Sequence, residues 1–104
     1  MSASPESGSP DARLRCVLTP ENAATPDNFY DCLAAELKLP SHFGRNLDAL
    51  YDCLSGDDVG PFEITVQQPG RMRAMLGDMW DEIAVLLLDV VTERDDATVI
   101  FSNG

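Results

Sequence analysis

The sequence has few basic residues. Its 104 residues include 18 Asp and Glu but only 7 Lys and Arg, with one histidine, so the formal net charge is −11. A surface this acidic repels nucleic acid and anionic membranes, and it attracts basic proteins at raised rates. Acidity also keeps a protein soluble whatever it binds, so charge alone does not establish a partner. It does argue against a protein that binds nucleic acid or a membrane directly.

Segments that anchor or export a chain are also missing. No run of residues approaches the ~20 apolar residues that span a bilayer. No basic stretch followed by an apolar one opens the chain, so the sequence predicts no signal peptide. The cysteines, Cys16, Cys32 and Cys53, are odd in number and lack a metal-type spacing. Apolar positions flank each of them, which favours reduced, buried thiols in a cytoplasmic protein.

The length predicts one domain with one core, and a hydrophobic content of 44% predicts that it folds. Residues 1–11 are mostly Ser, Pro and Gly and should form a flexible tail, which leaves 12–104 as the domain. Alternating and β-branched stretches predict strands at 13–19, 62–66 and 97–101. Helical spacing and breakers predict four helices: one from 25–27 to just before Pro40, one over 46–56, a short one over 71–76, and one from about 78–81 to 93.

This order, β-α-α-β-α-α-β, predicts an α/β fold, because strands joined by helices form a parallel sheet with right-handed crossovers. The sheet should have three strands. Three short strands cannot bury both faces, so the helices should pack mainly on one face and around the edges.

The helix over 46–56 has two different faces. Asn46 is a good N-cap, and Gly56 is expected to end the helix in a left-handed conformation. At 100° per residue one arc is apolar and the opposite arc is acidic, with an aromatic ring between two carboxylates. The apolar arc holds Leu47, Leu50, Cys53 and Leu54, and the acidic arc holds Asp48, Tyr51, Asp52 and Ser55.

The two aspartates of this helix are not equivalent. Asp48 lies in the first turn, where a negative charge is favourable beside the positive end of the helix dipole. Asp52 lies near the other end, where the same charge is unfavourable, and like charges at i and i+4 also repel. Helix stability therefore accounts for Asp48 but not for Asp52. Further acids follow at 57–58 and on the last helix, and would form one negative patch if the two helices meet.

Three interpretations of this acidic surface are possible. A hydrolase or metal-dependent enzyme could use His42, Asp48 and Asp52, but no Gly-rich phosphate loop or Cys/His cluster accompanies them, so we expect no metal, no cofactor and no enzyme activity. A solvated acidic face with a half-buried Tyr51 is the simplest alternative. A protein interface fits better, because an aromatic ring flanked by acids provides rigid contact area and steering charge.

The stretch Leu37-Lys-Leu-Pro-Ser-His-Phe-Gly-Arg-Asn-Leu-Asp-Ala-Leu-Tyr-Asp-Cys-Leu-Ser-Gly56 resembles the barstar family, intracellular inhibitors of barnase-type ribonucleases. The pattern is long and specific, and with the element order and the last strand the likeness covers about residues 12–102. The resemblance implies a three-stranded parallel sheet with four helices. It also implies that the second helix and its flanking loops plug a ribonuclease active site, with Asp52 in place of an RNA phosphate.

The resemblance also implies the contact residues and where they differ from the family. His42 replaces a family tyrosine, Asp57 replaces an aromatic residue, and the acid on the last helix falls on Asp89 or, one turn later, on Glu93. The implied ribonuclease-binding residues are His42, Phe43, Gly44, Asn46, Asp48, Tyr51, Asp52, Ser55, Gly56, Asp57 and Asp89.

The predicted function is inhibition of a basic, secreted, guanyl-specific microbial ribonuclease in a 1:1 complex. We expect a bacterial, cytoplasmic protein that is monomeric when free and contacts neither nucleic acid nor membrane. The alternative is a barstar-like acidic module for another basic protein that is not a nuclease.

Overall fold

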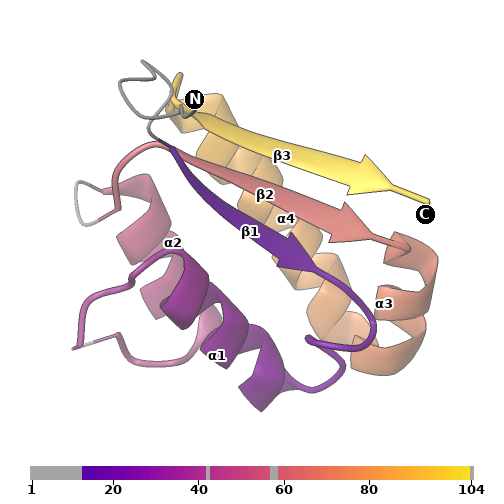
Figure 1. The fold of residues 1–104 in the computed structure, drawn as a ribbon. Coiled ribbons are helices and arrows are strands. Elements are labelled where there is room, and N and C mark those ends of the chain that lie inside the picture. Colours follow the sequence, from indigo (N-terminus) through magenta and orange to yellow (C-terminus); the bar gives the residue numbers. More distant parts are fainter. Residues whose placement is uncertain (1–12, 42, 57–58, 104) are drawn as a thin grey trace, which may run out of the picture.

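The computed structural model describes residues 13–41, 43–56 and 59–103 (Figure 1). Its elements follow the predicted order, and each boundary lies close to the position predicted from the sequence. They are β1 (Leu14–Leu18), α1 (Pro26–Glu36), α2 (Leu47–Ser55), β2 (Phe62–Gln67), α3 (Pro69–Leu76), α4 (Asp78–Glu93) and β3 (Ala97–Ser102).

The sheet is parallel, with its strands in the order β1-β2-β3. Leu14 pairs with Phe62, and Phe62 pairs with Ala97, so the three strands begin level with one another. Both crossovers step in the same direction across the sheet, and right-handed crossovers in one direction place their helices on the same face. Figure 1 shows α1, α2 and α4 on one side of the sheet. The predicted α/β fold, with three parallel strands and four helices, is confirmed.

The core lies between this covered face and the three helices. Alternate residues of β2 are buried, and their neighbours in the same strand are only partly buried, as the period of two requires. Full burial of a large apolar side chain contributes about 1.5–3 kcal/mol, so the helices are held chiefly by these contacts. The fully buried side chains include Leu18, Phe62, Ile64 and Val66 from the sheet, and Phe29, Leu33, Leu50, Leu54, Ile83 and Leu87 from the helices.

Local signals in the sequence fix the ends of α1. The Thr25 hydroxyl accepts a hydrogen bond from the Asn28 amide at 3.2 Å, and Pro26 occupies the first turn. The helix ends at Glu36, earlier than Pro40 requires, because Lys38 adopts a φ of +54°. No helix in the described part of the chain is both long and apolar enough to cross a membrane.

Candidate functional site

Helix α2 has the two faces that its sequence predicts. The Asn46 side chain accepts a hydrogen bond from the Ala49 amide at 2.8 Å, so the predicted N-cap is confirmed. Leu50 and Leu54 are buried against the core, while Asp48 and Asp52 are exposed. The helix is therefore anchored by one side and presents carboxylates on the other.

The end of α2 differs from the prediction. Gly56 has φ −94° and ψ −160°, which is extended backbone, so the predicted left-handed conformation is wrong. Its amide donates to the Asp52 carbonyl at 3.1 Å. A Cβ at this position would lie only 3.0 Å from the same carbonyl oxygen. Glycine is needed here because of this close approach, not because of a positive φ.

Arg94, the residue after α4, caps this end of α2 in place of a left-handed turn. Its Nη1 donates to the Leu54 carbonyl at 2.7 Å and to the Gly56 carbonyl at 3.5 Å. Asp96 accepts from the same guanidinium at 2.8 Å, and the Phe62 ring centroid lies 5.3 Å away. The Arg94 side chain is only 11% exposed. One largely covered cation thus joins the ends of α2 and α4.

Sequence reasoning missed this role of Arg94. The signal was a single basic residue between Glu93 and the acids at 95–96. Arg94 lies 40 residues after Leu54, so no local sequence pattern indicated that its side chain binds the Leu54 carbonyl.

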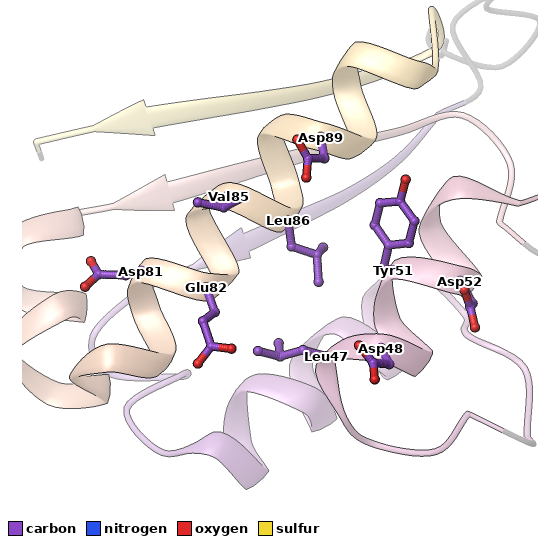
Figure 2. Close-up of a pocket in the computed structure, with 9 residues that line it drawn as sticks. All are labelled: Leu47, Asp48, Tyr51, Asp52, Asp81, Glu82, Val85, Leu86 and Asp89. Carbon is purple, nitrogen blue, oxygen red and sulfur yellow. The ribbon is translucent and has the colours of Figure 1, made fainter.

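Helices α2 and α4 enclose a groove of about 760 Å³ (Figure 2). Its apolar lining comes from Leu47 on α2 and from Val85 and Leu86 on α4, and Figure 2 shows Leu47 and Leu86 pointing into the space between the helices. The two helices thus bring acids from distant parts of the sequence to one surface. The polar residues of the lining are Asp48, Tyr51 and Asp52 on α2, and Asp81, Glu82 and Asp89 on α4.

Four of these acids have no cation of their own. Among the described residues, no hydrogen bond or ion pair is made by the side chains of Asp48, Asp52, Glu82 and Asp89. Asp81, in contrast, pairs with Arg73 at 3.0 Å. The negative charge of the groove is therefore carried by both helices, by Asp48 and Asp52 on α2 and by Glu82 and Asp89 on α4.

Tyr51 connects the two helices above the groove. Its hydroxyl donates a hydrogen bond to the Glu93 carboxylate. This bond raises the pKa of Tyr51 above its ordinary value of 10.0, and slight burial and the charges of Glu93, Asp89 and Asp52 add to the effect. Glu93 is thus engaged within the molecule, whereas Asp89 is available to a ligand of the groove.

The segment before α2 is held by packing. The Phe43 ring meets Tyr30 edge to face, with centroids 5.8 Å apart, and belongs to the periphery of the core. A Cβ on Gly44 would lie 3.2 Å from the Asn46 side-chain nitrogen and 3.4 Å from the Ala49 Cβ. Phe43, Gly44 and Asn46 therefore shape the approach to α2 and are not freely projecting groups.

Arg45, the basic residue just before α2, is neutralised by acids of α1. With a φ of +55°, it directs its Nη1 to Asp31 on α1 at 2.7 Å and its Nη2 to the Asp27 carbonyl at 3.2 Å. The guanidinium also lies 6.0 Å from the centroid of the Tyr30 ring. Sequence reasoning did not identify this clamp between α1 and the segment before α2.

Of the predicted contact residues, Asp48, Tyr51, Asp52 and Asp89 line one groove. Ser55 and Gly56, both half-buried, lie at the far end of α2. His42 and Asp57 are outside the described residues. Within the described ranges, no three His, Cys, Asp or Glu side chains are grouped so as to hold a metal ion.

Comparison with known proteins gives two findings. A family model described as "Barstar (barnase inhibitor)" matches residues 15–102. A Bacillus subtilis (strain 168) protein named "Putative ribonuclease inhibitor YrdF" is 31% identical over 67 residues, which cover 64% of this chain and 74% of that protein.

Proposed function

We propose that this chain, which belongs to the barstar family of barnase inhibitors, inhibits a basic, secreted, guanyl-specific ribonuclease. Family membership gives a barnase-inhibitor-like role, and the groove between α2 and α4 is our candidate for the surface that covers the enzyme. The observation that carries the proposal is the set of acids along that groove without an ion pair among the described residues, namely Asp48, Asp52, Glu82 and Asp89.

Asp52 is the proposed mimic of an RNA phosphate. It is exposed, it lies in the last turn of α2 where the helix dipole disfavours a negative charge, and it has no partner among the described residues. A ribonuclease site that binds a phosphate offers cationic side chains in a confined, partly desolvated space. Charge-assisted hydrogen bonds formed there are stronger than neutral ones. Asp52 would therefore gain in the complex the counter-charges that it lacks in the free protein.

Tyr51 and Asp89 are the proposed supports of this contact. The bond from Tyr51 to Glu93 holds the ring over the groove, so less side-chain freedom is lost when a partner binds. Asp89 would take a second cation of the enzyme, and Leu47 and Leu86 would supply apolar contact area. This surface is formed by one chain, which supports a 1:1 complex. None of the three cysteines forms a disulfide in the described structure, which supports action in the cytoplasm.

The direct test is titration of a guanyl-specific microbial ribonuclease with the full chain, read by enzyme activity and by calorimetry. Asp52→Asn should weaken binding by about 2 kcal/mol or more, roughly thirtyfold in Kd, because an interfacial cation would lose its partner. Glu36→Gln is the matched control, since Glu36 is exposed on α1, outside the groove, and its loss changes the net charge equally.

Equal effects of the two substitutions would contradict the proposed site. Binding to a basic protein without inhibition of any ribonuclease would instead favour the alternative, an acidic binding module.

A further inference from the structure

Two of the three cysteines lie side by side. Cys16 is in the middle of β1 and Cys32 is on α1, and their sulfur atoms are 3.8 Å apart. The contact exists because α1 packs on the sheet next to β1, so it joins two elements that are separate until the chain folds. The sulfurs must approach by less than 2 Å to reach a disulfide bond length of about 2.05 Å.

The two thiols differ in access and in chemistry. Cys16 is 1% exposed, whereas Cys32 is only half-buried and can be reached from solvent. Burial raises the pKa of both thiols, and the hydrogen bond between them adds to the rise of the pKa of Cys16 but partly offsets the rise for Cys32. Cys32 is therefore the thiol that forms a thiolate more readily, and Cys16 is the one placed to react second.

We propose that Cys16 and Cys32 form an intramolecular disulfide when the protein meets a low-molecular-weight disulfide such as oxidised glutathione. The Cys32 thiolate attacks one glutathione sulfur, which forms a mixed disulfide and releases one glutathione thiolate. Cys16 then attacks the Cys32 sulfur, which forms the protein disulfide and releases the second glutathione thiolate. The two cysteine protons pass to the released thiolates, so two protein thiols are oxidised and one glutathione disulfide is reduced.

The bridge would fasten α1 to β1 through a short loop of chain. By the loop-entropy account, such a bridge should raise the melting temperature by about 10 °C. None of the residues that line the groove lies in β1 or α1, so we expect binding of a ribonuclease to persist in the oxidised protein. The inference is thus independent of the proposed function and can fail or hold separately from it.

To test this, the full chain is treated with oxidised glutathione at mildly alkaline pH, and the thiols that remain are then alkylated. Intact mass and peptide mapping identify which cysteines carry the alkyl group. We expect loss of the mass of two hydrogen atoms, one alkylated residue at Cys53, and full reversal by dithiothreitol. Cys53→Ala should keep the bridge and its thermal shift, and Cys32→Ser should abolish both.

Several outcomes would overturn the proposal. They are a stable glutathione adduct on Cys32, a disulfide that includes Cys53, a disulfide between two molecules, or three alkylatable thiols after prolonged oxidation.

Discussion

Replacement of Arg94 by alanine tests the link between α2 and α4. The substitution removes a charge-assisted hydrogen bond of 2.7 Å to the Leu54 carbonyl, which is worth about 1.5–3 kcal/mol. It also removes the stacking of the guanidinium over Phe62 at 5.3 Å, which is worth about 0.5–2 kcal/mol. The Asp96 carboxylate is half exposed, so its ion pair adds little. We expect Arg94→Ala to lower the free energy of unfolding by about 3 kcal/mol.

The assay is equilibrium urea unfolding of the two proteins, with the change taken from the midpoint at an unchanged slope. Arg94→Lys should lose less than Arg94→Ala, because an ammonium group keeps the charge and one donor but not the planar fork. Asp96→Asn should have a small effect. A loss below about 1 kcal/mol for Arg94→Ala, or an equal loss for Asp96→Asn, would show that the carbonyl cap does not stabilise α2 as we argue.

Three further predictions follow from the same structure. Gly56→Ala should lower the free energy of unfolding by about 1–2 kcal/mol in the same urea assay, because the added Cβ would press on a backbone carbonyl of α2. Gly60→Ala is the control and should be nearly neutral, because open space surrounds the added Cβ. Glu93→Gln should lower the pKa of Tyr51 towards 10.0, measured by ultraviolet-monitored titration, and an unchanged tyrosine titration would contradict the hydrogen bond. Burial raises the pKa of the Cys16 thiol above its ordinary 9.0, so above pH 9.0 the unfolded chain releases this proton and the folded chain keeps it. The free energy of unfolding should therefore fall by about 1.4 kcal/mol per pH unit from this group, and the fall should be shallower by that amount in Cys16→Ala.

Local patterns in the sequence predicted most of the fold, because they act within a few residues. The Asn46 cap depends on an amide three residues away, and the alternation in β2 follows from the geometry of a single strand. The groove could be foreseen only as a possibility, since the meeting of α2 and α4 depends on their packing on the same face of the sheet. The conformation of Gly56 could not be predicted, because it depends on a guanidinium that arrives from residue 94.

The same limit applies to the other connections of the site. The clamp on Arg45 joins it to Asp31 across 14 residues, and the bond from Tyr51 to Glu93 spans 42. The left-handed conformations at Lys38, Arg45 and Gln68 fall on residues with no intrinsic preference for them. Distant contacts accompany two of them, since Arg45 binds Asp31 and the Gln68 amide donates to the Ser102 carbonyl. Sequence reasoning predicted which side chains of α2 are exposed and which are buried, but not the contacts that hold the helix in place.

The distribution of ion pairs separates the two explanations of the acidic surface. Solubility requires only net charge, and it sets no rule for which acids the few cations should neutralise. In the described part of the chain, ion pairs link Arg45 to α1, Arg73 to Asp81 and Arg94 to Asp96, and none involves an acid of α2. Arg94 even reaches the end of α2 but donates to its carbonyls, which leaves Asp52 without a counter-charge. The described part of the chain thus leaves both acids of α2 without an ion pair, as a surface that receives cations from another protein requires.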